Sequence, residues 1–252
     1  MKRWNSLGYL FCLLLLVMVG WAQDTKPVRL LISGGGDWHP YGQGSGALID
    51  ALRVSGGFVC SYSEDPQALH YEHLKHFDVL MIYNGVFYEG EEGGQKVPTP
   101  GYIPEGIQRF VQEGGGLVCV HSAVASFSDW PGFQDLIGGI WIWKKSKHDA
   151  YGPLKSDVVK PDHPVVQGLP ATFTFPDEFY HTLDILPGVE VLIESTHEKN
   201  GEMVTEPLVW IAKDTTQERV ITVLHGHDMG SWGTAELQTL MRNALEWAAR
   251  KR

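Results

Sequence analysis

The sequence has 252 residues, of which 43% are hydrophobic, 20% are charged and 11% are aromatic. This apolar content suffices for a large core and excludes a disordered chain, a collagen and a coiled coil. The formal net charge is −10, and the lysines and arginines form no basic run. Because phosphate binding needs a basic face, we expect no nucleic-acid partner.

The first 22 residues have the pattern of a secretory signal peptide. Lys2 and Arg3 precede a strongly apolar stretch from Leu7 to Val19, and the small residues that follow suit cleavage after Ala22. An uncleaved N-terminal anchor is the alternative. No later segment has the composition of a membrane span. We therefore expect a single domain over residues 23–252, exported to the periplasm or the cell exterior and not attached to a membrane after cleavage.

Short apolar runs alternate with helix-like segments in the first half of this domain. Strands are predicted at Val28–Ser33, Phe58–Tyr62, Val79–Tyr83 and Leu117–Val120, helices at Ser45–Ser55 and from Pro104 to Gly114, and a loop at Gly90–Gly101. Strands that alternate with helices imply an α/β fold with a mainly parallel sheet and right-handed crossovers.

The pattern becomes irregular between Trp141 and Pro187. Val158-Val159, Val165-Val166 and Phe173–Phe175 predict short strands separated by prolines, which indicates an inserted section with antiparallel pieces at the edge of the sheet. Regular elements then resume, with strands at Val189–Glu194, Leu208–Ala212 and Val220–Leu224 and a final helix whose apolar stripe runs from Leu237 to Ala248.

Cys60 and Cys119 are the only cysteines after the signal peptide. An exported protein permits a disulfide, but both residues lie in apolar runs, so we expect buried free thiols. Two cysteines also cannot form a cysteine-rich structural zinc site.

Histidines follow three of the predicted strands. His39 comes after the first strand, next to Trp38, His121 comes directly after the fourth, and His225 and His227 come after the last. Ligands of such sheets bind beyond the carboxyl ends of the strands. We therefore expect His39, His121 and His227 to converge on one cleft, and His225 to lie in the core or behind the site.

Six sequence motifs, taken in order, resemble the ThuA-like (trehalose utilisation) family of the class I glutamine amidotransferase-like superfamily. They are GGGDWHP (34–40), FVQEGGGLVCVHSA (110–123), FSDWPGFQDLIGG (127–139), DHPVVQGL (162–169), DEFYHTL (177–183) and HGHD (225–228). The resemblance runs from about Val28 to Arg250. It implies a flavodoxin-like three-layer sandwich with a mostly parallel central sheet, and a role in sugar catabolism that includes trehalose and keto-glycoside routes.

The sequence departs from true class I amidotransferases at the nucleophile. Those enzymes place a cysteine on the sharp turn after the central strand, where this chain has His121. Cys119 lies two residues earlier, inside the strand, where a base cannot easily activate it. Glutamine amidotransferase activity is therefore not expected, and a residual cysteine hydrolase would require Cys119 to reach the cleft.

The candidate catalytic residues are His121 and His227, as acids, bases or metal ligands, and Glu178, as a proton carrier or ligand at the rim of the cleft. Trp38, His39 and Tyr180 are candidate substrate-binding residues. Each has a structural alternative: a carbonyl-bonded histidine for His121, a ring stacked on Trp38 for His39, and a turn cap for Glu178.

A metal is a further possibility at this site. His39, His121, Glu178 and His227 have donor atoms that suit zinc or another divalent ion, although their long spacings match no local metal signature. The leading hypothesis is an exported enzyme that catalyses the hydrolysis, elimination or isomerisation of a sugar or keto-glycoside. Its expected partner is therefore a small-molecule substrate. A non-catalytic carbohydrate-binding protein is the alternative.

Overall fold

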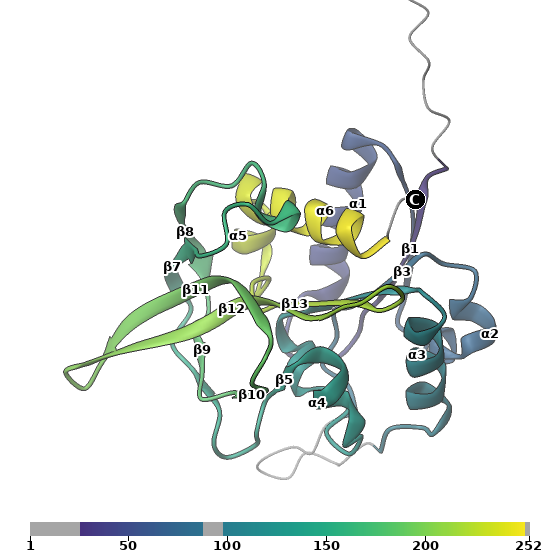
Figure 1. Cartoon of the computed structure of the whole chain (residues 1–252), viewed down its shortest axis with the longest axis horizontal. Coiled ribbons are helices and arrows are strands. Elements are labelled where there is room, and N and C mark those ends of the chain that lie inside the picture. The colour runs from purple at the N-terminus through teal and green to yellow at the C-terminus, as the bar shows by residue number, and fades with distance from the viewer. Residues whose placement is uncertain (1–25, 88–97, 250–252) are drawn as a thin grey trace, which may run out of the picture.

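A computed structural model describes residues 26–87 and 98–249 of the chain (Figure 1). Within these ranges the centre of the fold is a nine-stranded sheet of order β2-β1-β3-β4-β13-β12-β11-β7-β8. The predicted signal peptide and most of the predicted loop at Gly90–Gly101 lie outside the described residues. No helix in the described ranges is long and apolar enough to cross a membrane.

The first half of the sheet is parallel, as the alternating pattern predicted. Its strands are β1 (Val28–Ser33), β2 (Phe58–Ser63), β3 (Val79–Ile82), β4 (Gly116–Val120) and β13 (Arg219–Val223). Every residue of β3 and β4 is buried, because helices cover both faces of the sheet there.

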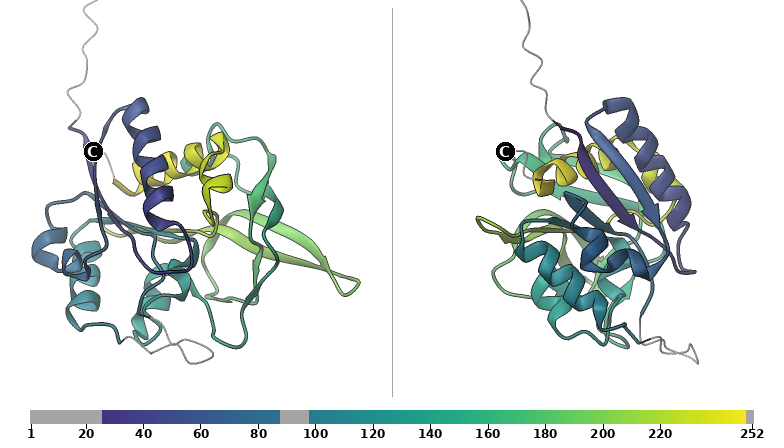
Figure 2. Two further views of the ribbon diagram at one scale, coloured as in Figure 1. Left: turned by 180° about the vertical axis from the view of Figure 1, so that it is seen from behind. Right: turned by 90° about the vertical axis from the view of Figure 1, so that its right-hand side faces the viewer.

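Successive side chains of each parallel strand point to opposite faces, and this alternation divides the core in two. In β1, Leu30 and Ile32 pack into one core and Leu31 into the other. The first core is covered by α1 (Tyr41–Ser55), α5 (Met229–Trp232) and α6 (Ala235–Ala249), and the second by α2 (Tyr71–Leu74), α3 (Tyr102–Gln112) and α4 (Gly132–Ile137) (Figure 2). The predicted three-layer α/β class is confirmed.

The second half of the sheet is antiparallel. Its strands are β12 (Glu202–Asp214), β11 (Glu190–Lys199), β7 (Gly152–Val158) and β8 (Thr172–Asp177). The pair β7–β8 is the antiparallel edge that the irregular segment predicted. Two small ladders complete this half, β5 (Gly139–Ile140) with β10 (Asp184–Ile185) and β6 (Lys147–His148) with β9 (Tyr180–His181).

The strand predicted at Val165-Val166 was wrong. These residues form the 3-10 turn η3 (Pro164–Val166), because Pro164 suits a first helical position and the ring of His163 accepts the amide proton of Val165. His163 thus has a structural role in this turn. Two further 3-10 turns are η1 (Pro66–Leu69) and η2 (His121–Ala125).

Helix α1 begins at Tyr41, four residues before its predicted start. The first turn contains glycines, which disfavour a helix in sequence-based reasoning. Gly44 is needed there because a Cβ at this position would lie 2.5 Å from the indole nitrogen of Trp232. Close packing of this turn on the core therefore outweighs its weak helix propensity.

Cys60 and Cys119 are free thiols, as predicted. Cys119 is buried in β4 and Cys60 is half-buried in the edge strand β2. Strands β2 and β4 are separated by β1 and β3, which places them roughly 14 Å apart at about 4.8 Å per strand. The two residues also belong to opposite cores, so no disulfide can join them.

An ion pair between Arg29 and Asp78 joins β1 to the start of β3. Arg29 donates its backbone N–H to Asp78 Oδ2 at 2.8 Å, and two N–H groups of its guanidinium donate to the same carboxylate at 3.1 and 2.7 Å. Hydrogen bonding by Arg29 lowers the pKa of Asp78, so the pair stabilises the fold above the ordinary aspartate pKa and less as the pH falls through the lowered value.

We expect Asp78→Asn to reduce the free energy of unfolding by about 1 kcal/mol near neutral pH, a figure that allows for solvent screening of this partly exposed pair. The difference from the unsubstituted protein should shrink as the pH falls toward 3, measured by urea denaturation at each pH. Asp50→Asn, which breaks the fully exposed pair of Asp50 with Arg53, is the control and should change little. A pH-independent loss in Asp78→Asn would contradict the electrostatic account.

Candidate functional site

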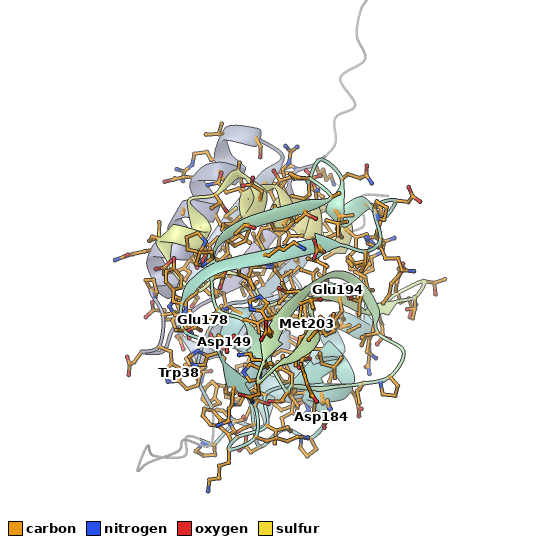
Figure 3. All side chains as sticks on the ribbon, turned by 90° about the vertical axis from the view of Figure 1, so that its left-hand side faces the viewer. Trp38, Asp149, Glu178, Asp184, Glu194 and Met203 are labelled. Atoms are coloured by element: carbon orange, nitrogen blue, oxygen red, sulfur yellow. The ribbon has the colours of Figure 1, made fainter. Side chains whose placement is uncertain are left out.

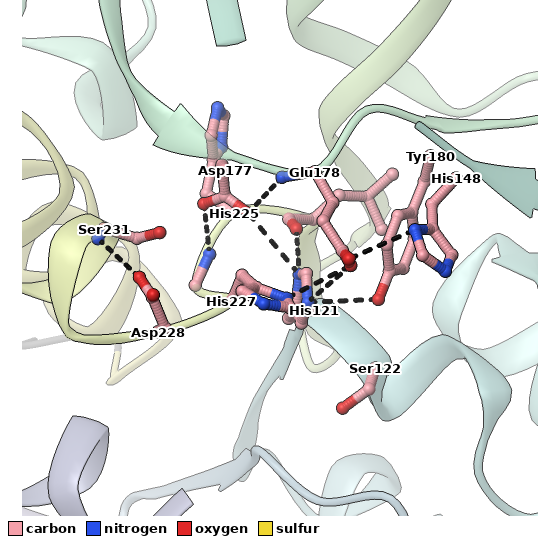
Figure 4. Close-up of polar contacts among 12 residues, drawn as sticks. His121, Ser122, His148, Asp177, Glu178, Tyr180, His225, His227, Asp228 and Ser231 are labelled. Atoms are coloured by element: carbon pink, nitrogen blue, oxygen red, sulfur yellow. Dashed lines mark hydrogen bonds and ion pairs between the residues drawn. The ribbon is translucent and has the colours of Figure 1, made fainter. Parts of the chain in front are cut away.

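The candidate site lies at the carboxyl ends of the parallel strands, beside the reversal of strand order between β1 and β3. The loop after β1 supplies Trp38 and His39, the turn after β4 supplies His121, and the loop after β13 supplies His227. The inserted section supplies Glu178 and Tyr180 from the end of β8 and from β9 (Figure 4).

His121 sits on a sharp turn between β4 and η2. Its φ is 53°, in the left-handed region that residues other than glycine rarely adopt. The Nδ1–H group donates to the carbonyl of Leu224 at 2.7 Å, which leaves Nε2 as an acceptor for the Tyr180 hydroxyl at 3.0 Å. Burial lowers the pKa of His121 to about 4, so the ring is neutral at pH 7.

Glu178 is the charged centre of the site. One carboxylate oxygen lies 3.1 Å from His148 Nδ1, and the other lies 3.1 Å from His227 Nδ1 and 3.7 Å from His121 Nε2 (Figure 4). Burial by itself would raise the pKa of Glu178, but hydrogen bonding by His148 and His227 outweighs it and lowers the pKa below the ordinary value. Glu178 is only 7% exposed, so it lies inside the cluster and not at the rim that the sequence predicted.

Glu178 in turn raises the pKa of the two histidines that lie next to it. Its hydrogen bond raises the pKa of His148. Burial alone would lower the pKa of His227, but the same carboxylate outweighs burial and raises it. The site therefore combines an ionised carboxylate with two imidazoles that hold a proton more readily than usual.

His39 packs against the other two histidines of the predicted set. Its ring centroid lies 4.5 Å from that of His121 and 4.7 Å from that of His227. Burial, with further contributions from the two neighbouring rings, lowers the pKa of His39 to about 3. One ligand atom of each of the three histidines lies within 4.8 Å of the others. The structure thus brings the three residues together, and their roles stay predictions.

Asp177 fixes the inserted section to the parallel half of the sheet. It is buried and accepts the N–H groups of Gly226 and Glu178, both at 2.8 Å. The turn-cap role considered for this motif therefore belongs to Asp177, whereas the carboxylate of Glu178 points into the site.

An aromatic wall adjoins the histidines. Trp38 lies 5.9 Å from Trp143, and Trp141 lies 5.3 Å from Tyr180 and 6.1 Å from His148, measured between ring centroids. Trp141 and Trp143 also line a cavity of about 360 Å³ whose floor is built from η2 and the start of α4. Figure 3 shows Trp38 and Glu178 on the same side of the molecule.

Sequence reasoning missed two contributors. His148 contacts Glu178. The Tyr151 ring lies 4.9 Å from that of His227 between centroids, and its hydroxyl donates to Asp228 at 2.6 Å. No motif marks either residue, because both approach the site only through the folding of the inserted section.

Other candidates take structural places. His225 is buried near Phe173 and Phe175 with Nε2 2.9 Å from Ser156 Oγ, which agrees with its expected place in the core. Trp130 packs on Phe133 at the start of α4. Cys119 is fully buried and burial raises the pKa of its thiol, so it does not reach the cleft as a cysteine nucleophile would have to.

Several solved structures have a fold similar to that of this chain. It is similar to a ThuA-like protein from Parabacteroides merdae (23% identity, 89% of this chain and 91% of that chain covered, TM-score 0.73) and to another from Bacteroides uniformis (22%, 88% and 92%, 0.69). A glutamine amidotransferase from Thermotoga maritima shares the fold at 14% identity (88% and 98%, TM-score 0.55). At these identities the likeness shows the fold alone.

A search of curated proteins found no match. The family model described as ThuA, trehalose utilisation, matches residues 29–248, which is nearly all of the described chain. The chain therefore belongs to the ThuA family, which is involved in trehalose utilisation.

Proposed function

We propose that this chain is an exported enzyme of carbohydrate catabolism that cleaves keto-glycosides by proton transfer. The observation that carries the proposal is Glu178, an ionised carboxylate held between His148 and His227 at the carboxyl edge of a parallel sheet. A buried carboxylate beside imidazoles of raised pKa suits general acid–base catalysis, in which protons move between substrate atoms. The family's link to trehalose utilisation and the signal-peptide pattern of residues 1–22 support the sugar substrate and the export.

A keto group on a sugar ring makes the hydrogen on the neighbouring carbon acidic. With the ketone at C3, a base removes the C2 proton, the bond from C1 to the glycosidic oxygen breaks, and a C1–C2 double bond forms. The departing oxygen takes a proton from an acid, which releases the aglycone as an alcohol. Addition of water across the double bond then completes a net hydrolysis.

The residues of the site divide these tasks. Glu178 is assigned as the base that accepts the C2 proton, because it is the ionised carboxylate at the centre of the site. His148 is half-exposed and hydrogen-bonded to Glu178, and is assigned as the acid that protonates the departing oxygen. His227 holds its proton more readily than usual and is assigned as the donor to the oxygen of the ketone, while the neutral ring of His121 orients the Tyr180 hydroxyl.

The aromatic wall supports a substrate with more than one ring. Sugar C–H faces pack on aromatic rings, and the cavity beside Trp141 has a volume typical of small-molecule sites, which run from about 300 to 1,000 Å³. Because the Trp141 ring contacts both Tyr180 and His148, the part of the substrate that does not react would lie on the wall while the keto sugar meets Glu178.

A non-catalytic sugar-binding protein is the second candidate. The observation that favours it is the complete burial of His121, whose Nε2 atom is already bonded to the Tyr180 hydroxyl. In that case the aromatic wall would bind the ligand, and the histidine cluster would only stabilise the loops.

Turnover is the first test. Glycosides and 3-keto-glycosides are incubated with the protein, and products are followed by mass spectrometry. We expect release of the aglycone from keto-glycosides and a loss of at least about 100-fold in His121→Asn, which tolerates the left-handed backbone. His163→Ala, remote from the site, is the control and should keep full activity. Sugar binding without turnover by the unsubstituted protein would support the second candidate instead.

Trp141→Ala tests the aromatic wall. We expect KM for a keto-disaccharide to rise about tenfold, equivalent to about 1.4 kcal/mol, with kcat little changed and KM for a keto-monosaccharide unaffected. Tyr102→Ala, whose ring stacks on His70 away from this cavity, should change neither constant. An equal rise in KM for both substrates would contradict a separate place for the second ring.

Glu178→Gln tests the charge at the centre of the site. Loss of the carboxylate removes the main cause of the raised pKa of His148, so that pKa should fall and the ring should lose its proton at a lower pH. Titration of the histidine rings by NMR measures the change. Asp228 does not contact His148, so Asp228→Asn should leave the pKa of His148 unchanged. An unchanged pKa for His148 in Glu178→Gln would show that the two groups do not interact.

A further inference from the structure

We propose that His39, His121 and His227 bind one divalent transition-metal ion, with Glu178 and the carbonyl of Leu224 orienting two of the rings. The inference does not depend on the proposed function, since a metal at this place is compatible with either an enzyme or a binding protein. It starts from three observations: the convergence of the rings, the groups that lie next to the Nδ1 atoms of His121 and His227, and the buried Nδ1 atom of His39, which has no hydrogen-bond partner among the described residues.

The three rings converge. One ligand atom of each histidine lies within 4.8 Å of the other two, and the three residues form a group of potential metal ligands within the described ranges. The ring planes cross at 72°, 73° and 79°, so the rings are T-shaped to one another and not stacked. A nitrogen lone pair lies in the plane of its ring, so the convergence of one ligand atom from each ring is what a metal would use.

The hydrogen bonds of two rings set their tautomers. His121 carries its proton on Nδ1, because this atom lies 2.7 Å from the carbonyl oxygen of Leu224, which can only accept. His227 Nδ1 lies 3.1 Å from a carboxylate oxygen of Glu178, an ion-pair contact. The Nε2 lone pair of His227 is left for a ligand, whereas that of His121 accepts the Tyr180 hydroxyl, which a metal would displace. Metal-binding histidines are held in this way, by a carbonyl or a carboxylate on the other ring nitrogen.

His39 supplies the third observation. Its Nδ1 atom is buried and has no hydrogen-bond partner among the described residues. A buried polar atom without a partner costs about 1–3 kcal/mol, so a fold rarely keeps one without a use. A metal ion between the rings would give this nitrogen the partner that the protein does not provide.

The ligand set indicates which ions fit. Three imidazole nitrogens with an open fourth position suit zinc and its first-row neighbours, whereas magnesium and calcium prefer oxygen. Bonds of about 2.1 Å at tetrahedral angles would bring the nitrogens to about 3.4 Å from one another, so binding requires the rings to close by about an ångström. It also requires the Tyr180 hydroxyl to release His121 Nε2.

Metal titration tests the proposal without a substrate. The purified protein is stripped with a chelator and titrated with Zn²⁺ by calorimetry and with Co²⁺ by visible absorption, which reports nitrogen ligation. We expect one ion per chain. His39→Ala and His227→Ala should weaken binding at least 100-fold, and Glu178→Gln should weaken it about 10- to 100-fold by leaving His227 without its orienting partner.

His148→Ala and His163→Ala are the matched controls, since each removes a histidine that lies outside the group of three. Both should bind the ion as the unsubstituted protein does. Circular dichroism confirms that each variant is folded before it is titrated. Absence of a stoichiometric site, or equal affinity in His39→Ala and His227→Ala, would overturn the proposal. A protein that cleaves keto-glycosides after complete removal of metal and binds none would overturn it while leaving the proposed function intact.

Discussion

The buried carboxylate of Asp177 is the contact on which the site depends. It accepts one N–H from Gly226, in the loop after the parallel strand β13, and one from Glu178, in the inserted section. Gly226 reaches this position with a φ of 122°, and a Cβ there would lie 3.2 Å from the Trp232 ring. The Asp177 side chain therefore fixes the segment that carries Glu178 to the loop that carries His227, in addition to the pairing of β12 with β13 that joins the two halves of the sheet.

The division of the site between the parallel half of the sheet and the inserted section explains which of its parts the sequence could predict. The histidines His39, His121 and His227 follow parallel strands whose apolar runs and glycines are easy to identify, and parallel strands must end at one edge. Glu178 and His148 arrive through ladders of only two residues, β6 with β9, which have no apolar periodicity of their own. Their place depends on long-range pairing, so the depth of Glu178 and the contact of His148 could not be read from the sequence.

The same reasoning applies to the fold. The buried strands were predicted closely because continuous short apolar runs and flanking glycines mark them. The hairpin of β11 and β12 extends well beyond the apolar runs at Val189–Glu194 and Leu208–Ala212 (Figure 1). Its outer residues are mostly polar and are held by backbone pairing and by cross-strand contacts such as that of Thr196 with Thr205, so they show no apolar alternation. The prediction at Val165-Val166 was wrong because two β-branched residues suggested a strand. Pro164 and the capping ring of His163 favour a 3-10 turn there instead.

A shared fold with glutamine amidotransferases does not bring their chemistry, and the reason is a shift of two residues. The turn after β4 presents His121, with a left-handed φ, while Cys119 stays fully buried in the strand. Burial keeps His39 and His121 neutral, so the negative charge of Glu178 is shared with His148 and His227 alone. One side of the cluster thus holds an ionised carboxylate with two imidazoles whose pKa is raised, and the other holds two neutral imidazoles. In the proposed reaction, the first of these sides is the one that transfers protons.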